Sequence, residues 1–254
     1  MKLGIIGCGA IGTDVAEAVD MMKEIEKIYL YDINNSAAQT LQKHLKKAVV
    51  QPVEEFLKNV DLVFEAASQE AVNQYAVPIL EAKKDIVLMS IGSLFDDTFR
   101  KKLETVARKN HKKIYLPSGA VCGIDGVLAA SVKKLDSVTL VTTKSPLSLG
   151  VKVEERTVIF KGTAREAVKK FPRNINVAAC LSLAGVGFDE TKVEIVADPV
   201  ETRISHKILA HGHFGRLRAE VENMPNPHNP KSSYMASLSA IAVLRKIIDP
   251  IQII

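Results

Sequence analysis

Short apolar runs alternate with segments of helical periodicity along the first half of the chain. Each run ends at a glycine, aspartate, proline or lysine-rich turn, which is typical of a buried strand. Alternation of strand and helix predicts parallel crossovers and an α/β fold with a doubly wound parallel sheet. The predicted strands are 3–6, 28–31, 62–65, 86–89 and 114–116, and the predicted helices are 11–22, 37–46, 70–82 and 98–110.

The pattern changes after residues 117–120. Polar and apolar residues then alternate over short stretches, as in antiparallel strands that have one solvated face. We therefore expect a first domain over 1–118 and a second, α+β domain over 119–232. The apolar segment 233–247 is expected to form a helix that packs back on the first domain. The predicted strands of the second domain are 138–143, 157–161, 193–196 and 214–221, and its predicted helices are 164–171 and 177–184.

A G-x-G-x-x-G turn at residues 7–12 joins the first predicted strand to a helix. In that context the first glycine permits a tight turn, and the second lets the backbone approach a pyrophosphate. The third glycine lets the helix pack close to the strand. The phosphates would lie at the helix N-terminus, where N–H groups are free. The cofactor-binding residues predicted here are Gly7, Gly9, Ala10, Ile11 and Gly12.

Asp32 closes the second predicted strand, 20 residues after Gly12. A carboxylate at this point accepts hydrogen bonds from the ribose hydroxyls of adenosine and repels a 2′-phosphate, so NAD is the expected cofactor. Asn34 and Asn35 could soften this discrimination, which leaves NADP as a second candidate. The alternative is a glycine turn without a ligand, in which Asp32 only caps the strand.

Small residues follow two other predicted strands. Ala66, Ala67 and Ser68 come after strand 62–65, and residues 90–93 come after strand 86–89. Small side chains at the carboxyl ends of parallel strands suit a cofactor that passes close to the backbone. They suit ordinary turns equally well, so both explanations stay open.

A series of ordered motifs extends the pattern over nearly the whole chain. They are Pro117-Ser118-Gly119-Ala120, Gly123-Ile124-Asp125, Lys170-Phe171-Pro172-Arg173-Asn174-Ile175-Asn176-Val177-Ala178-Ala179, Val196-Ala197-Asp198-Pro199, His206-Lys207-Ile208, Gly212-His213-Phe214-Gly215, Asn223-Met224-Pro225 and Asn229-Pro230-Lys231-Ser232-Ser233. In this order the motifs resemble the aspartate dehydrogenase family. Ordered motifs of this extent are far more specific than the glycine turn alone.

The resemblance implies a Rossmann domain followed by an α+β catalytic domain, assembled as a homodimer. It implies NAD(P)-dependent oxidation of L-aspartate through iminosuccinate to oxaloacetate and ammonia, and iminosuccinate can feed quinolinate and NAD synthesis. By resemblance, Ala120 and Asn176 contact the nicotinamide cofactor and His206 is the active-site residue. Imidazole suits a proton-transfer role because it titrates near neutral pH. Local sequence alone favours a hydrogen-bonded, partly buried side chain at His206, and it is the family resemblance that favours the catalytic role.

A small dicarboxylic amino acid requires cations or N–H groups for its carboxylates. Lys231, Ser232 and Ser233 precede the last predicted helix and offer a cation, hydroxyls and free N–H groups. An ordinary helix cap is the alternative. Lys144 is another candidate carboxylate partner, with a solvated surface side chain as its alternative. Relatives often carry two basic residues after the threonine pair that precedes Lys144, whereas this chain carries one.

Histidine spacing also raises the question of a metal. His211 and His213 would share one face if both lay on a strand, with His206 nearby. No Glu-x-x-His pair or paired cysteines complete such a site, and hydride transfer needs no metal, so none is expected.

Composition excludes several classes of protein. The 254 residues carry a net charge of +5 without a basic stripe interleaved with aromatics, and tryptophan is absent, so nucleic-acid binding is not expected. No apolar run reaches the ~18 residues of a membrane span, and no signal-peptide cleavage pattern appears. We therefore expect a cytoplasmic protein without a membrane partner. Three widely spaced cysteines indicate neither a disulfide framework nor a zinc site.

Two other functions stay open on sequence grounds. One is a related two-domain reductase, similar to homoserine dehydrogenase or dihydrodipicolinate reductase. The other is a non-catalytic NAD-binding redox sensor, which would keep the glycine turn and Asp32 without needing His206. Steady-state assays with the substrate of each enzyme would distinguish a related reductase from an enzyme that oxidises aspartate. NADH binding without turnover would identify the second.

Overall fold

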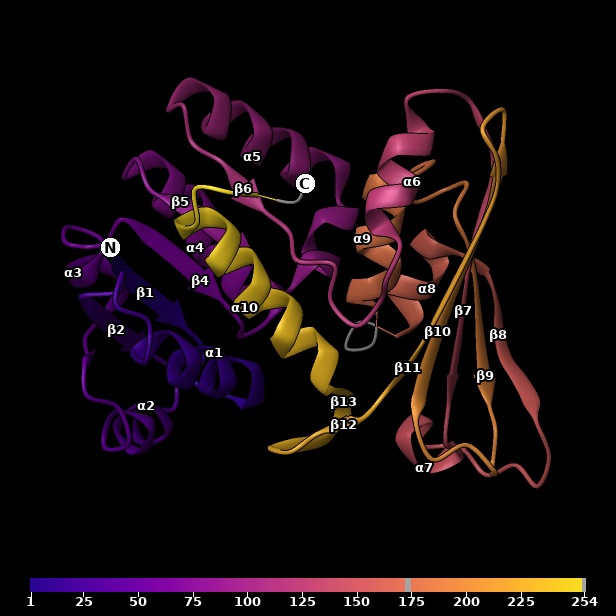
Figure 1. Ribbon diagram of the computed structural model, residues 1–254, viewed down its shortest axis with the longest axis horizontal. Helices are drawn as coiled ribbons and strands as arrows, with labels where there is room; N and C mark the ends of the chain where they lie inside the picture. The colour runs from indigo at the N-terminus through magenta and orange to yellow at the C-terminus, as the bar shows by residue number, and fades with distance from the viewer. Residues whose placement is uncertain (172–174, 253–254) are drawn as a thin grey trace. The chain divides into compact units, whose positions relative to one another are not determined.

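The computed structural model describes residues 1–171 and 175–252. The chain divides into two compact units (Figure 1). One comprises Met1–Pro117 together with residues 237–252, and the other comprises residues 118–236. The part of the motif formed by Pro172, Arg173 and Asn174 lies outside the described residues. Within the described chain, no helix combines the length and the apolar character needed to cross a bilayer.

The first unit is built on a six-stranded sheet in which all pairings are parallel, with strand order β3-β2-β1-β4-β5-β6. The order reverses beside β1, which makes the carboxyl ends of β1 and β4 the switch point of the sheet. The predicted doubly wound sheet is therefore confirmed. The strands are β1 (Lys2–Ile6), β2 (Lys27–Tyr31), β3 (Ala48–Val50), β4 (Leu62–Glu65), β5 (Asp85–Leu88) and β6 (Ile114–Tyr115).

Strand β3 was not predicted from the sequence, because this edge strand has only three residues and all of them are half-buried. A strand so short lacks the alternation or the apolar run that marks a strand in a sequence. Its place at the edge also explains why its three residues are only partly buried.

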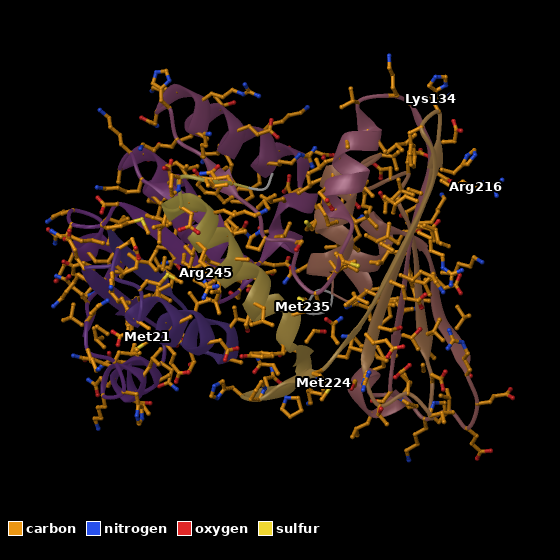
Figure 2. All side chains as sticks on the ribbon, in the orientation of Figure 1. Met21, Lys134, Arg216, Met224, Met235 and Arg245 are labelled. Atoms are coloured by element: carbon orange, nitrogen blue, oxygen red, sulfur yellow. The ribbon has the colours of Figure 1, made fainter. Side chains whose placement is uncertain are left out.

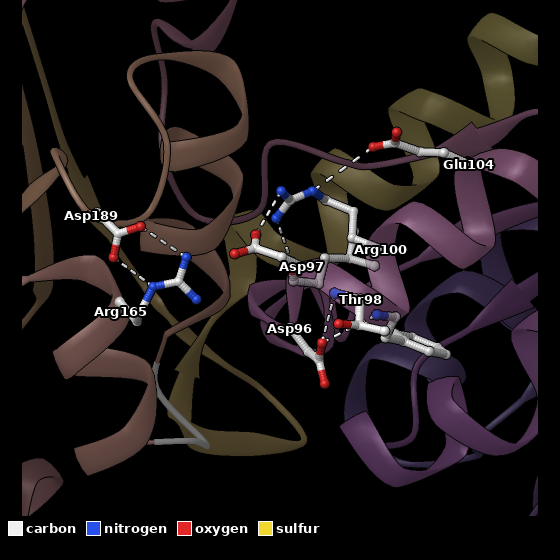
Figure 3. A network of polar contacts seen from close by, with 9 residues as sticks. Asp96, Asp97, Thr98, Arg100, Glu104, Arg165 and Asp189 are labelled. Atoms are coloured by element: carbon white, nitrogen blue, oxygen red, sulfur yellow. Dashed lines mark hydrogen bonds and ion pairs between the residues drawn. The ribbon is translucent and has the colours of Figure 1, made fainter.

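Helices connect the strands and cover the sheet (Figure 1). Two of them begin at side-chain caps: before α4, Ser68 accepts a hydrogen bond from the N–H of Ala71 at 3.2 Å, and before α5, Asp96 accepts two from the first turn of that helix (Figure 3). Such caps satisfy N–H groups that have no partner inside the helix. The helices are α1 (Ala10–Asp20), α2 (Asn35–Gln42), α3 (Val53–Phe56), α4 (Gln69–Glu81), a 3₁₀ turn (Ile91–Phe95), α5 (Asp97–Lys109) and α10 (Tyr234–Ile248).

The second unit contains a five-stranded mixed sheet with the order β11-β10-β7-β9-β8. Only β7 and β9 pair in parallel, and the other neighbours are antiparallel, which confirms the predicted α+β domain. The strand 204–212 was not predicted, although it carries His206. The strands are β7 (Leu135–Lys144), β8 (Thr157–Thr163), β9 (Lys192–Ala197), β10 (Ile204–Gly212) and β11 (Gly215–Asn223).

Helices α6 (Ile124–Ser131), α8 (Ala164–Lys170) and α9 (Asn176–Ala184) lie on one face of this sheet (Figure 1). Arg165 in α8 forms two hydrogen bonds with Asp189, which follows α9, and so links the two helices (Figure 3). A short helix, α7 (Pro146–Leu149), follows β7. The hairpin of β12 (Pro225–Asn226) and β13 (Asn229–Ser233) leads directly into α10.

Candidate functional site

The glycine turn has the geometry of a phosphate cradle. Gly7 has a φ of +99°, and a Cβ there would come within 2.5 Å of the Ala66 carbonyl oxygen. A Cβ on Gly12 would overlap the carbonyl oxygen of Gly7, so helix α1 packs against the turn as closely as glycine permits. A Cβ on Gly9 would meet nothing within 4 Å. The space above Gly9 is therefore open for a ligand, as the pyrophosphate of a dinucleotide requires.

Helix α1 begins directly after this opening. Gly9 is its N-cap residue and supplies no side-chain cap, so Ala10 and Ile11 lie in an uncapped first turn. The N–H groups of such a turn have no partner inside the helix and favour an anion. The residues of the turn thus fit a dinucleotide phosphate.

Asp32 ties the end of β2 to the glycine turn. Its Oδ2 accepts a hydrogen bond from the N–H of Cys8 at 2.7 Å, and its Oδ1 accepts one from the N–H of Asn34 at 2.8 Å. Each carboxylate oxygen has a second lone pair, so both can still accept a ribose hydroxyl. Burial, assisted by the charge of Asp32, raises the pKa of the Cys8 thiol to about 12. Cys8 therefore stays protonated and serves as a small packing residue.

A cavity of about 220 Å³ lies beside the glycine turn within the first unit. It is lined by Gly7, Asp32, Ala67 and Ser68, four residues that the sequence had indicated. Tyr31 and Tyr75, whose hydroxyls are 3.1 Å apart, also line it. The sequence reading missed both tyrosines, because Tyr75 belongs to α4 and only the fold brings it to the end of β2.

His206 lies on β10 in the second unit, with a relative exposure of 5%. Alternate residues Ile204, His206 and Ile208 are buried, whereas Leu209 and His211 are exposed, so the His206 ring is on the covered face of the sheet. Its Nδ1 is 2.9 Å from the hydroxyl of Thr142, which lies directly opposite on β7. Thr142 was not predicted as a site residue.

Lys144 ends β7 two residues after Thr142 and is also buried, with a relative exposure of 7%. Burial lowers the pKa of its ammonium group. Burial, and secondly the charge of Lys144, lower the pKa of His206 from its ordinary value of 6.5 to about 3. The imidazole is consequently neutral at physiological pH. Surface solvation, the alternative weighed for Lys144, is wrong because the strand end is covered.

The cavity beside Thr142 and Lys144 is about 10 Å³, room for roughly one water molecule. Apolar side chains from β7, β9 and the segments around α9 close it. A cavity of this size is too small for an amino acid.

Ala120 is held by a residue that the sequence reading did not select. The Nδ2 of Asn223 donates to the carbonyl oxygens of Ala120 at 3.0 Å and Ile204 at 3.2 Å. The adjoining Gly119 lies beside Val177, which a Cβ on Gly119 would meet at 3.8 Å. Val177 follows Asn176, the first residue of α9, so the fold brings the Ala120 loop and the start of α9 together.

Lys231, Ser232 and Ser233 lie on β13, immediately before α10. Lys231 is exposed, and its backbone N–H donates to the side chain of Asn229, while the Ser232 hydroxyl donates to the Asn229 carbonyl. No hydrogen bond or ion pair within the described chain links these three residues to His206. Their substrate role stays a prediction.

The two other histidines of the predicted pattern do not share a strand. His211 is exposed on β10 and pairs with Asp136, whereas His213 lies in the turn beyond Gly212, where the register with β7 shifts. Figure 2 labels Lys134 and Arg216 at this end of the hairpin. The carbonyl oxygen of Lys134 accepts a hydrogen bond from the N–H of His213. Among the described residues, no group of three or more histidine, cysteine or acidic side chains could hold a metal ion.

Comparison with known proteins gives the chain its family. It is 46% identical to the L-aspartate dehydrogenase of Methanosarcina barkeri, with 100% of this chain and 99% of the relative covered. The chain belongs to the aspartate dehydrogenase family. Consistently, residues 125–247 match the family model described as aspartate dehydrogenase, C-terminal, and residues 7–117 match the NAD-binding domain of homoserine dehydrogenase.

Solved structures agree with this membership. The aspartate dehydrogenase of Thermotoga maritima has a TM-score of 0.84 and 31% identity, covering 100% of this chain and 99% of the other. A dihydrodipicolinate reductase from Paenisporosarcina has a TM-score of 0.55 and 12% identity, covering 96% and 92%, which shows a shared fold alone. The related-reductase alternative is therefore set aside in favour of the aspartate dehydrogenase family.

Proposed function

We propose that this protein is an L-aspartate dehydrogenase: it oxidises L-aspartate with NAD(P)⁺ to iminosuccinate, and water converts that product to oxaloacetate and ammonia. The observation that carries the proposal is full-length identity of 46% to an L-aspartate dehydrogenase. The phosphate cradle in the first unit and the buried His206 in the second supply the groups that such a reaction needs.

The cofactor is a nicotinamide dinucleotide held on the glycine turn, with its adenosine ribose on Asp32. NAD is favoured over NADP because a 2′-phosphate would face the Asp32 carboxylate. Gly7, Gly9, Ala10, Ile11 and Gly12 would hold the pyrophosphate. When bound, the oxidised nicotinamide accepts the hydride from the amine-bearing carbon. The residues following β4 (Ala66, Ala67 and Ser68), with Ala120 and Asn176, would contact the rest of the cofactor.

His206 handles protons in this proposal. A substrate ammonium must lose a proton before hydride can leave, and the imine then needs an activated water. Burial keeps the imidazole neutral, which is the form that accepts a proton, but the same lowering of its pKa makes it a weaker base than an exposed histidine. A base at Nε2 requires that Nδ1–H donates to the hydroxyl of Thr142, so Thr142 would fix both the tautomer and the ring orientation.

Two groups would bind the substrate carboxylates. Lys144 is close enough to His206 for its charge to lower the imidazole pKa, so a carboxylate that reached Lys144 would lie near the proton-accepting group; the cavity of about 10 Å³ beside Lys144 would have to widen to admit it. The negative charge of that carboxylate would offset the positive charge of Lys144. The pKa of His206 would then rise, and His206 would be a stronger base. Lys231, Ser232 and Ser233 would take the other carboxylate.

The resemblance also supports a cytoplasmic homodimer whose iminosuccinate feeds quinolinate and NAD synthesis. Sedimentation of the full chain tests the dimer, and capture of released iminosuccinate by a quinolinate-forming condensation tests the metabolic link.

Appearance of NADH absorbance on mixing the protein with L-aspartate and NAD⁺ tests the activity. L-glutamate and L-homoserine serve as controls for substrate choice. Turnover with L-aspartate alone is expected. NADH binding without turnover on any of the three would refute the enzyme assignment and favour a redox sensor.

A further inference from the structure

A buried carboxylate, Glu65, lies at the end of β4, directly before Ala66. Its relative exposure is 1%. Its Oε1 accepts hydrogen bonds from the N–H of Ala67 and the hydroxyl of Ser90, both at 2.8 Å. Its Oε2 accepts a third from the N–H of Ser90 at 3.0 Å. One side chain thus joins the segment after β4 to the segment after β5.

Core packing does not explain a carboxylate at this position. The other residues of β4, Leu62, Val63 and Phe64, are apolar and buried. Burial raises the pKa of Glu65, while the hydrogen bonds from Ser90 and Ala67 oppose that effect. Burying a carboxyl group is costly unless its partners are well placed. The hydrogen bonds of Glu65 hold the segment after β4 and the segment after β5 in fixed positions.

The strand order shows which part of a bound dinucleotide these segments would meet. The pyrophosphate lies on the turn after β1, and Asp32 places the adenosine half over β2, on one side of β1. The other half must then extend over the opposite side, across the carboxyl ends of β4 and β5. Ala67 and Ser90 come directly from those ends.

We propose that Glu65 is a positioning residue of the cofactor site: by tying Ala67 to Ser90, its carboxylate sets the surface on which the nicotinamide half of the dinucleotide lies. The inference rests on the proposed function, since it takes the ligand to be a nicotinamide dinucleotide. It predicts that loss of the carboxylate weakens binding of the nicotinamide half more than binding of the adenosine half.

The test is calorimetric titration of the full chain with NADH and, separately, with ADP-ribose. Glu65→Gln keeps the shape of the side chain but replaces one acceptor oxygen with an amide group, which opposes a backbone N–H. We expect NADH to bind about tenfold more weakly, a change of about 1.4 kcal/mol. ADP-ribose is expected to bind within about twofold of wild type, because Ala67 is one of several residues that line the cavity beside Gly7 and Asp32, whereas Ser90 does not line that cavity.

Asp20→Asn is the matched control. Asp20 is another buried carboxylate of the same unit, and it accepts hydrogen bonds from the backbone N–H groups of Lys46 and Lys47. The Asp20→Asn variant shows how a general loss of stability in the unit affects binding. It should leave the ratio of the affinities for NADH and ADP-ribose unchanged. Equal weakening of NADH and ADP-ribose by Glu65→Gln would overturn the inference.

Ser90→Ala keeps the test decisive if Glu65→Gln does not fold. It removes one of the three donors and leaves the carboxylate and the backbone intact. About threefold weaker NADH binding, with ADP-ribose unchanged, is expected for the loss of a single hydrogen bond. No difference between the two ligands would overturn the inference. Failure of the wild-type chain to bind NADH would instead overturn the proposed function, and this inference with it.

Discussion

Replacement of His206 by asparagine should remove a large part of the acid sensitivity of folding. The imidazole is buried on β10, and its pKa is lowered to about 3, first by burial and then by the charge of Lys144. In the unfolded chain it titrates at its ordinary value of 6.5. The unfolded state therefore binds the extra proton as the pH falls below 6.5, and the folded state does not until about pH 3. Stability is lost on acidification across that window and is unaffected by His206 above it.

The size of the effect follows from the pKa difference. One pKa unit corresponds to about 1.4 kcal/mol, so ionisation of an unfolded-state histidine favours unfolding by about 2 kcal/mol at about pH 5 relative to about pH 7.5. His206→Asn lacks the titrating group and should not show this loss. Carboxylates with lowered pKa values, such as Glu166, Asp189 and Glu220, contribute equally to both proteins and cancel in the comparison.

Urea unfolding measures the free energy of unfolding at each pH. Far-ultraviolet circular dichroism is the probe, because the chain has no tryptophan for fluorescence. Wild type, His206→Asn and His211→Asn would each be unfolded at about pH 7.5 and about pH 5. His211 lies on the same strand but is exposed, so His211→Asn should lose as much stability as wild type. An equal loss in His206→Asn and wild type would refute a neutral, buried imidazole.

Four further outcomes test the site. Asp32→Ala should weaken NAD⁺ binding and lessen rejection of NADP⁺, and equal binding of both cofactors by the wild type would contradict the role of Asp32. Lys231→Ala should raise the KM for aspartate by about 10- to 150-fold, since a charge-assisted contact contributes about 1.5–3 kcal/mol; an unchanged KM would place Lys231 outside the substrate site. His206→Ala should lower kcat by about 10²–10⁴-fold with NADH binding intact, whereas near-full kcat in His206→Asn would make His206 an orienting residue. Thr142→Val should lower kcat by about tenfold while leaving the KM for NAD⁺ unchanged, because the ring loses one hydrogen bond; an unchanged kcat would exclude the tautomer role.

Local sequence was sufficient to predict the glycine turn after β1 and the alternation of strands and helices. Gly7 needs a positive φ and Gly12 needs a close approach, and both demands arise between residues only a few positions apart. Alternation of apolar runs likewise predicted five strands of the parallel sheet, because a strand buried on both faces must be continuously apolar. The exception, Ala48–Val50, is an edge strand with too few buried positions to leave a pattern.

The second unit shows what only tertiary structure decides. His206 and Thr142 are 64 positions apart and meet because β10 and β7 pair in one register; a shift of one residue would turn His206 to the exposed face. Ser90 and Glu65 are 25 positions apart in the sequence. They meet because β4 and β5 are neighbouring parallel strands, whose carboxyl ends lie side by side. The low pKa of His206 depends on burial, which no local pattern encodes. Sequence determined which residue types were available for the chemistry, while strand register and burial determined which of them meet and in what charge state.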